Sequence, residues 1–289
     1  MTIYRLERAD RDEFALNQVI YSAADIEMWY DWKARLDDTK FTEECYWLMQ
    51  EDKRFGGIIQ LGDTLMYPFL IPPAADRKVF WTALISSLGI EVRQINGVLQ
   101  KDVDILLCLG FEAQTIRQVM CSPTGCQDAP ELAQGLTLYE LNDSTDLNPI
   151  KNLMRRAYEG GIDYESFGTP SEDELLENIR YVLDVYRHRN LSIHVTEDLS
   201  EEAIGVCLAG VGEQMPLGFA EIAEIGVAPS HQGLGIAEFM LRYVKKQAGS
   251  CSDVVKLCVT VGNPAANLYQ KMGFQGAPSF TNMSRTAMK

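Results

Sequence analysis

Hydrophobic and polar positions along the chain form two series of short elements, separated by one stretch without periodicity. That stretch, Ser122–Gly135, combines prolines and glycines with polar residues and reads as a linker. We therefore expect domains at residues 1–121 and 136–289, which suits a length of 289 residues. Both domains are predicted to contain strands and helices in alternation.

The second half has the clearer pattern. Period-2 or continuous apolar runs predict strands, and apolar positions three and four apart predict helices. Ser171 and Glu174 have the spacing of a capping box, and Gly249 is expected to end the helix before it at a C′ position. The expected strands are 136–141, 191–196, 203–211, 218–227, 254–261, Phe274 and 280–288, and the expected helices are 149–158, 171–186, 235–248 and a short one capped by Asn263. This order predicts an α/β fold with a mixed sheet covered by helices.

Charge and composition exclude several classes of protein. The net charge of −15 argues against nucleic acid and anionic membranes as partners, and no apolar run is long enough for a membrane helix. The N-terminus lacks the apolar stretch of a signal peptide, and seven cysteines without CxxC spacing indicate reduced thiols in a cytoplasmic protein. Three scattered histidines predict no metal site.

Candidate chemistry lies in V-A-P-S-H-Q-G-L-G-I-A, residues 227–237, where a strand runs into a helix through Gly233 and Gly235. Backbone N–H groups at such a turn, together with the helix dipole, can bind phosphate. The lysine of a P-loop is missing, and Glu238 stands where a Rossmann fingerprint needs a small residue. The glycines could also serve only to make the turn.

Two motifs together carry a resemblance to a known family. Val227, Pro229, Gln232, Gly235 and Ala237 form V-x-P-x-x-Q-x-x-G-x-A, which resembles the acetyl-CoA pyrophosphate loop of the GNAT N-acetyltransferases. The stretch N-P-A-A-N-L-Y-Q-K-M-G-F, residues 263–274, resembles the second signature of that family. The resemblance covers about residues 136–289 and implies acetyl-CoA as cosubstrate, no metal, and direct acetyl transfer to an amine.

The resemblance also implies site residues. Backbone amides from 232 to 237 would meet the pyrophosphate, and two strand residues before them would pair with the pantetheine arm. The cofactor-binding residues expected on this basis are Ile225, Val227, Gln232, Gly233, Leu234, Gly235, Ile236, Ala237 and Asn263. Asn263 is also expected to cap its helix. The basic residues Arg242, Lys245 and Lys246 would either reach a ribose phosphate or form a solvated helix face.

Acetyl transfer needs a base for the amine and an acid for the leaving thiolate. Glu221 stands where several members of the family carry a catalytic glutamate, and alternation places it on the strand face of Ala223, Ile225 and Val227, with Glu224 on the other face. Sheets of this family commonly bulge here, which would exchange the faces, so Glu224 or neither residue remains an alternative. Tyr269 is the acid that the second motif implies.

Further residues keep two interpretations. Tyr158, Tyr164 and Phe167 would either line the entrance for the acceptor or belong to the core. Cys258, in a valine-rich strand, is expected in the core and not as a nucleophile, because the family transfers its acyl group directly.

The first half resembles the second when the two are offset. An offset of 156 positions places Thr64–Trp81 on the acetyl-CoA strand and loop, and one of 163 places Asp104–Phe111 on the end of the second motif. The strands 46–50 and 57–61 and the helix 78–88 keep the order. The site residues are replaced, with Leu65, Arg77, Val79 and Leu106 at the positions of Glu221, Gly233, Gly235 and Tyr269. We expect a degenerate copy without catalysis; an unrelated α/β domain is the alternative.

The sequence as a whole predicts a cytoplasmic protein with two tandem GNAT (acyl-CoA N-acyltransferase) domains. The C-terminal domain would transfer an acetyl group from acetyl-CoA to an unidentified amine, expected to be a small molecule. A homodimer is compatible with this prediction. The rival hypothesis is a non-catalytic CoA-binding regulatory or scaffold protein, and the presence of both Glu221 and Tyr269 favours the enzyme.

Overall fold

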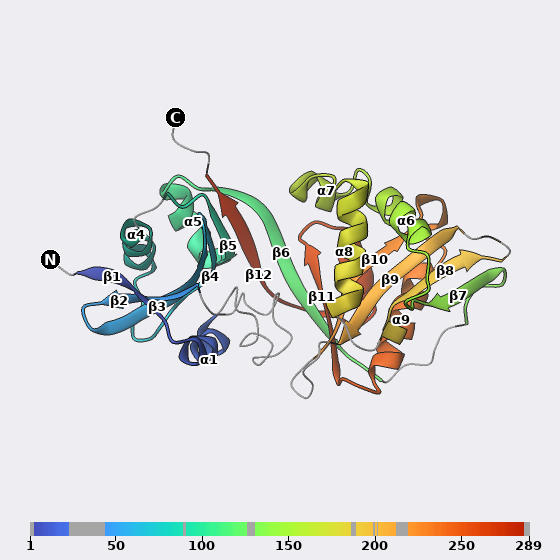
Figure 1. Ribbon diagram of the computed structural model, residues 1–289, viewed down its shortest axis with the longest axis horizontal. Coiled ribbons are helices and arrows are strands. Elements are labelled where there is room, and N and C mark those ends of the chain that lie inside the picture. Colours follow the sequence, from blue (N-terminus) through green and yellow to red (C-terminus); the bar gives the residue numbers. More distant parts are fainter. Residues whose placement is uncertain are drawn as a thin grey trace. The chain divides into compact units, whose positions relative to one another are not determined.

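The computed structural model of the chain describes residues 3–22, 44–88, 91–125, 131–185, 189–198, 200, 202–211 and 219–285. The chain forms two compact units, which are described one at a time (Figure 1). Unit 1 consists of Met1–Gln118 together with Pro278–Lys289, and unit 2 is Val119–Ala277. The last part of the chain therefore belongs with the first unit, whereas the sequence analysis placed it in the second domain.

The elements of unit 1 are β1 (Tyr4–Arg8), α1 (Arg11–Tyr21), β2 (Cys45–Gln50), β3 (Lys53–Leu61), β4 (Thr64–Leu70), α4 (Arg77–Ser87), β5 (Gln94–Leu99), α5 (Gln100–Cys108) and the start of β6 (Glu112–Pro123). Its strands lie in the order β1-β2-β3-β4-β5-β12, where β12 (Gln275–Ser284) is the last strand of the chain. Phe280–Ser284 pair with β5 in antiparallel register, and β4 with β5 is the parallel pair.

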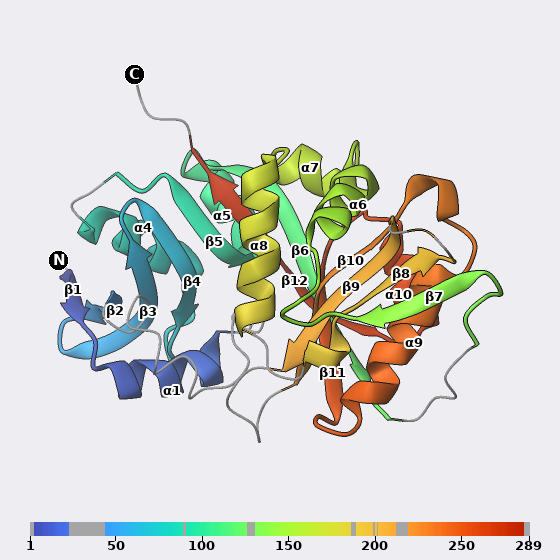
Figure 2. The same ribbon diagram turned by 45° about the vertical axis from the view of Figure 1, so that its right-hand side comes forward.

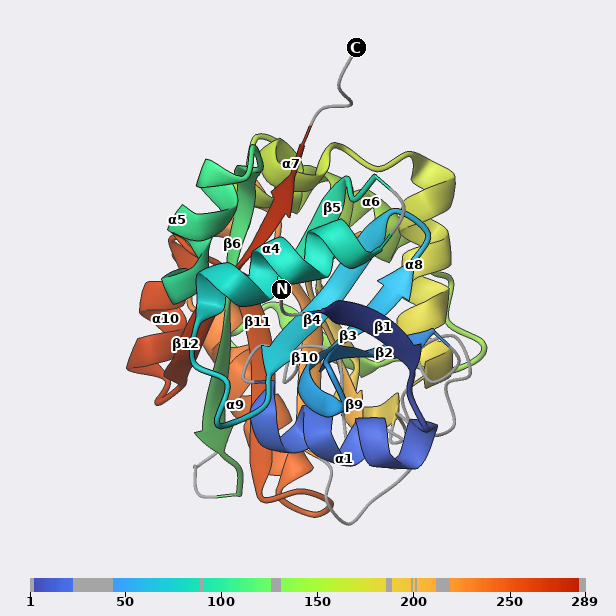
Figure 3. The same ribbon diagram turned by 90° about the vertical axis from the view of Figure 1, so that its left-hand side faces the viewer.

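Aromatic side chains fill both faces of the unit 1 sheet. Phe14 of α1 packs on Trp47 and Phe69, while Phe80 of α4 packs on Phe55. Figure 3 faces this unit and shows α4 lying across its strands. Both helices begin at an aspartate, because the carboxylates of Asp10 and Asp76 accept hydrogen bonds from first-turn N–H groups.

The elements of unit 2 are the end of β6, then β7 (Leu136–Glu140), α6 (Asn148–Tyr158), α7 (Ile162–Phe167), α8 (Glu172–Val185), β8 (Ile193–Glu197), β9 (Ala203–Val211), β10 (Ala220–Val227), α9 (Ile236–Ala248), β11 (Val254–Thr260), α10 (Ala265–Lys271) and the start of β12. Its strands lie in the order β6-β11-β10-β9-β8-β7. This is the mixed α/β sheet that the sequence predicts, with β10 and β11 as its parallel pair.

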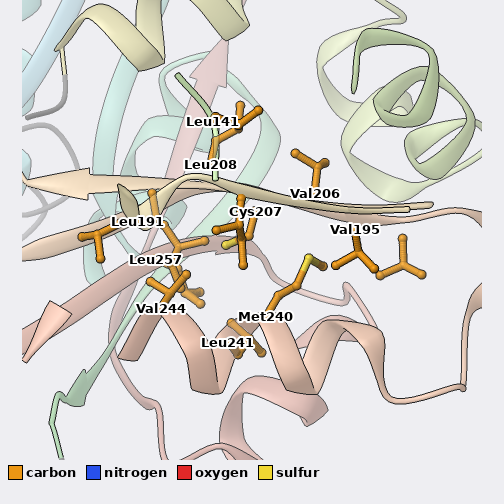
Figure 4. Close-up of a cluster of buried hydrophobic side chains, with 14 of the residues drawn as sticks. Leu141, Leu191, Val195, Val206, Cys207, Leu208, Met240, Leu241, Val244 and Leu257 are labelled. Atoms are coloured by element: carbon orange, nitrogen blue, oxygen red, sulfur yellow. The ribbon is translucent and has the colours of Figure 1, made fainter. Parts of the chain in front are cut away.

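Helices cover both faces of the unit 2 sheet (Figure 2). A Cβ atom at Gly205 of β9 would lie 2.8 Å from Ile236 of α9, which places α9 on one face. A Cβ atom at Gly226 of β10 would lie 3.2 Å from Cβ of Ala157, which places α6 on the other. In Figure 4, Val206 and Leu208 point to one side of β9, and Cys207 points to the side of α9. We call these the α9 face and the α6 face.

The two units repeat one order of elements. The series β1, α1, β2, β3, β4, α4, β5, α5, β6 corresponds to β7, α6, β8, β9, β10, α9, β11, α10, β12. In unit 2, α7 and α8 follow α6, and the corresponding stretch of unit 1, residues 23–43, lies outside the described ranges. Local hydrogen bonds agree with the offset of 163 that the sequence indicates. Phe111 N donates to Leu106 O in unit 1, and Phe274 N donates to Tyr269 O in unit 2.

The predicted elements of the second half are found with three differences. The capping box of α8 is present, since Ser171 and Glu174 bond each other's N–H groups. In place of the two closing strands there is the single strand β12, which begins after Phe274, and residues 286–288 lie outside the described ranges. The six-residue helix α7 was not expected. Residues 122 and 123 belong to β6 and not to a linker, and residues 126–130 lie outside the described ranges.

Gly249 ends α9 for a different reason from the one expected. Its φ of −61° is ordinary right-handed backbone, so it is not a left-handed C′ glycine. A Cβ atom there would lie 2.5 Å from Cα of Gly125, so a close approach of two chain segments requires the glycine.

Candidate active site

The central feature of unit 2 is a fork between its two parallel strands. β10 and β11 pair over three rungs, which end at Ile222 and Leu257. Beyond them β10 continues to Val227 and β11 to Thr260 outside this ladder. The register of β10 against β9 shifts between Ile222 and Glu224, so a β-bulge starts where the strands part. An extended ligand chain can therefore enter between the two strands.

The bulge changes which residues share a face. Glu221 lies opposite Gly210 of β9, and Glu224 lies opposite Leu208. Because Gly210 and Leu208 are two residues apart on β9, they share a face, and both glutamates therefore lie on the α6 face. Ile225 and Val227 lie on the α9 face, opposite Cys207 and Gly205. The expectation that Glu221 shares a face with Ile225 and Val227, and not with Glu224, is wrong because one inserted residue reverses the alternation.

Glu221 is held by a buried lysine. Its carboxylate lies 3.4 Å from Nζ of Lys256, the opposite residue on β11, and the side chains are 13% and 1% exposed. The ring centroid of Phe219 lies 4.5 Å from the same Nζ atom. Burial raises the pKa of the Cys121 thiol, although the positive charge of Lys256 opposes this shift. The positive charge of Lys256 thus balances the negative charge of Glu221.

Glu224 instead accepts a hydrogen bond from a tyrosine of the covering helix. The hydroxyl of Tyr158, at the end of α6, lies 2.8 Å from Oε2 of Glu224 and 3.0 Å from the carbonyl oxygen of Ile225. Burial raises the pKa of Tyr158 well above its usual value, and the charge of Glu224 raises it further. Tyr158 therefore stays protonated and can donate.

Tyr269, the candidate acid, lies in α10 with 7% of its surface exposed. Burial raises the pKa of this phenol, and Cys207, Asp163 and Glu224 add to the effect. Glu224 and Tyr269 thus lie within electrostatic reach of each other. A phenol whose pKa is above the ordinary value of about 10 remains a proton donor at neutral pH.

The unexpected helix α7 is docked onto the start of α10. Both carboxylate oxygens of Asp163 are used, one by the hydroxyl of Thr260 and the other by the Asn263 amide, 3.2 Å away. Oδ1 of Asn263 accepts from the backbone N of Ala265, the first residue of α10, at 2.9 Å, although the N-cap position is that of Pro264 and not of Asn263. The cofactor contact expected of Asn263 stays a prediction.

The glycine loop lies at the end of β10. Gly233 and Gly235 have φ of 79° and 83°, a left-handed conformation that other residues rarely adopt. Gly235 is the N-cap of α9, and it makes no side-chain cap hydrogen bond. Among the described residues, no heavy atom lies within 4 Å of a Cβ built on either glycine. The first N–H groups of α9, which have no partner within the helix, thus remain accessible to an anion.

The remaining loop residues are placed around these amides. Nε2 of Gln232 donates to the carbonyl of Val227 at 3.3 Å and ties the loop to the strand end. The side chain of Leu234 is exposed, and those of Ile236 and Ala237 face inward.

Two of the three basic residues of α9, Arg242 and Lys245, bind other groups of the protein, and Lys246 is exposed. Arg242 pairs with Glu238 at 2.8 Å, and Lys271 lies 3.3 Å from the same carboxylate. Lys245 is buried and donates to the carbonyl of Met272 at 2.7 Å, so it does not belong to a solvated face. Cys258 is half-buried on β11.

Sequence reasoning named Tyr158 and Tyr164 but missed Lys256 and Asp163. Tyr158 and Tyr164 lie near each other, with ring centroids 5.9 Å apart, and Phe167 is largely exposed. Lys256 interrupts an apolar strand, which is a signal for a buried charge with a partner. Asp163 gave no such signal, because its partners depend on how α7 docks.

Within the described ranges, no group of His, Cys, Asp and Glu residues is placed to hold a metal ion. No helix of the described residues is long and apolar enough to cross a membrane.

Similar structures cover the whole chain. A GCN5-related N-acetyltransferase from Sphaerobacter thermophilus has a TM-score of 0.71 at 16% identity, over 100% of this chain and 97% of that one. A tandem GNAT protein from the clavulanic acid biosynthesis pathway has a TM-score of 0.60 at 12% identity, over 100% and 99%. A GNAT-family acetyltransferase from Colwellia psychrerythraea has a TM-score of 0.56 at 15% identity, over 98% of each chain. At these identities the likeness concerns the fold.

Sequence comparison adds the family. No curated protein sequence matches the chain. The model of the acetyltransferase (GNAT) family matches residues 147–274, which include the forked strands, the glycine loop and both predicted signatures. This match supports acyl-CoA-dependent N-acetyltransferase activity in general, and acetyl-CoA is the cosubstrate of that family. Residues 147–274 of unit 2 thus match the GNAT acetyltransferase family, and along its whole length the chain has the fold of a tandem GNAT protein.

Proposed function

We propose that unit 2 transfers an acetyl group from acetyl-CoA to a primary amine and that unit 1 has no part in the chemistry. The observation that carries this proposal is the strand fork of β10 and β11, which leads to an uncapped glycine loop. A pantetheine arm fits between the strands, and a diphosphate fits against the N–H groups at Gly235. Glu224 follows the last rung of the fork by two residues, and its charge helps to raise the pKa of Tyr269.

Of the two carboxylates that the sequence offers, we favour Glu224 as the base. A carboxylate that already pairs with an ammonium group holds a proton less well, which disfavours Glu221 beside Lys256. Glu224 accepts a hydrogen bond from the neutral hydroxyl of Tyr158, and its charge helps to raise the pKa of Tyr269. Glu221 would then hold the strands at the fork together.

The proposed reaction balances in protons. The ammonium form of the acceptor loses two protons as its nitrogen forms a bond to the acetyl carbon and the C–S bond breaks. Glu224 takes the first proton and passes it to solvent. Tyr269 donates a proton to the leaving sulfur, and the second proton from the nitrogen restores the phenol by way of solvent. The fork contributes by holding both reactants in place.

A panel of primary amines, with release of the CoA thiol as readout, tests the function. Thiol release that depends on one class of amine and saturates with it would support an N-acetyltransferase. Saturable acetyl-CoA binding without acceptor-dependent release would instead support the rival, a non-catalytic CoA-binding protein.

Variants then separate the roles. Tyr269→Phe and Glu224→Gln should each lower kcat by about 100-fold, the usual contribution of an acid or base, with little change in the Kd for acetyl-CoA. Tyr181→Phe, at an exposed tyrosine of α8, is the control. Full activity of Tyr269→Phe would show that Tyr269 is not the acid. If Glu221→Gln, and not Glu224→Gln, abolished the acid limb of the pH profile, Glu221 would be the base.

A further inference from the structure

One hydroxyl group on the α6 face serves two acceptors. The Tyr158 hydroxyl is 2.8 Å from Oε2 of Glu224 and 3.0 Å from the carbonyl oxygen of Ile225. A phenol has one proton, so at any moment it can donate fully to one of these oxygens. The side chain is partly buried and packs against the core of unit 2, which holds the hydroxyl at these two acceptors.

This geometry suits both protonation states of Glu224. When Glu224 is ionised, the Tyr158 proton points to the carboxylate. When Glu224 has taken a proton, that proton can be donated to the phenol oxygen, and the Tyr158 proton turns to the Ile225 carbonyl. Only the hydroxyl hydrogen has to rotate, and no buried polar atom loses its partner.

We propose that Tyr158 is a positioning residue for the base, which fixes the Glu224 carboxylate beside the strand fork and remains hydrogen-bonded in both of its protonation states. The inference rests on the proposed function of unit 2. It assigns a role to the end of α6, a helix of the acceptor side that neither signature motif includes. Tyr158 acts through Glu224 and touches neither reacting atom.

Other groups also face this carboxylate. Tyr164 of α7 and Tyr269 of α10 both have a pKa that Glu224 raises, and Asp163 of α7 raises the pKa of Tyr158 and Tyr269. Of these neighbours, Tyr164 is the natural control. Its hydroxyl is buried and makes no hydrogen bond within the described residues. Tyr164→Phe removes the same atom from the adjacent ring without removing a donor to Glu224.

The test is the pH dependence of kcat/KM in Tyr158→Phe. Loss of a donor to the ionised carboxylate raises the pKa of Glu224, so the acid limb should move up by about one pH unit. Tyr164→Phe should leave the limb in place. If Tyr158 had only a structural role, Tyr158→Phe would lower the rate at all pH values without moving the acid limb, and that result would overturn the inference.

A second measurement does not depend on activity. The ¹³C shift of the Glu224 carboxyl, assigned by its loss in Glu224→Gln, can be titrated in the wild type and in Tyr158→Phe. An upward shift of its midpoint in the variant supports the inference, and an unchanged midpoint refutes it. If the wild type releases no thiol with any amine, the proposed function fails, and the titration still decides whether Tyr158 controls Glu224. In the Glu224→Gln background, Tyr158→Phe should cause no further loss of rate.

Discussion

Both units contain a three-rung parallel ladder that ends in a fork, and the residues around the two forks differ in kind. The middle rung is Glu221–Lys256 in unit 2 and Leu65–Ile95 in unit 1. The sequence offset had already placed Leu65 at the position of Glu221. The same backbone arrangement thus carries a charged pair in one unit and an apolar pair in the other.

The fork of unit 1 is filled by its own side chain. Just beyond the last rung, Tyr67 has a φ of 47° and is buried. A Cβ atom at Gly97 of β5 would lie 2.3 Å from the Tyr67 ring, so the ring lies flat against that strand. The corresponding residues of unit 2 are the small Ala223 and Cys258. We infer that the ring of Tyr67 takes the space that a pantetheine arm would need.

The helix after each fork also differs. In unit 1, Asp76 is the N-cap of α4 and accepts from Val79 N at 3.0 Å. In unit 2 the N-cap is Gly235. The structural counterpart of Gly235 is therefore Asp76 and not Val79, because the connection from the fork to the helix is shorter in unit 1. A carboxylate of the protein occupies the position where unit 2 would accept a phosphate.

The largest effect is expected from giving unit 2 the cap of unit 1. Gly235→Asp would force a left-handed residue and would let a carboxylate compete for the helix N–H groups, so acetyl-CoA binding should weaken by at least about 100-fold, as calorimetry would show. Gly135→Asp is the matched control, since Gly135 has a φ of 87° and open space around it. If Gly235→Asp still bound acetyl-CoA tightly, the chain would have a second acetyl-CoA site, and the proposed difference in binding between the units would be contradicted.

An intermediate effect is expected at the middle rung. Lys256→Ile alone leaves Glu221 without its buried partner and should destabilise the protein by about 3 kcal/mol in denaturant unfolding. Glu221→Leu with Lys256→Ile copies the apolar pair of unit 1 and should restore most of that stability. If Glu224 is the base, the acid limb of the pH–rate profile should be unchanged in the double variant. A double variant no more stable than the single one would show that the rung cannot be exchanged between the units.

The smallest effect is expected from removing the cap of unit 1. Asp76→Ala should lower the free energy of unfolding by about 1 kcal/mol, the usual contribution of an N-cap aspartate. Because Asp76 lies outside the proposed site, thiol release by the folded protein should not change. A change in KM for acetyl-CoA would mean that unit 1 contributes to the site.

Local patterns predicted the fold of each half well. β9 has the predicted bounds, because a continuous apolar run is typical of a strand buried on both faces. The helix of the capping box and the short helix after Asn263 were predicted from their first residues. α7 was missed because six residues with no buried side chain leave no apolar periodicity.

Non-local features could not be predicted in this way. The bulge after Ile222 adds one residue, and it decides that Glu221 and Glu224 share a face. The pairing of Phe280–Ser284 with β5 depends on residues far apart in the sequence, and the strand itself carries no sign of its partner. The Tyr158–Glu224 bond arises from the same bulge together with the packing of α6.

The place of the last strand has a consequence for the order in which the protein is made. Unit 1 needs residues from both ends of the chain, because β12 supplies the strand next to β5. During synthesis its first 118 residues leave the ribosome early, but the edge of β5 stays unpaired until the C-terminal residues follow. The half that is translated first is therefore the half whose sheet is completed last.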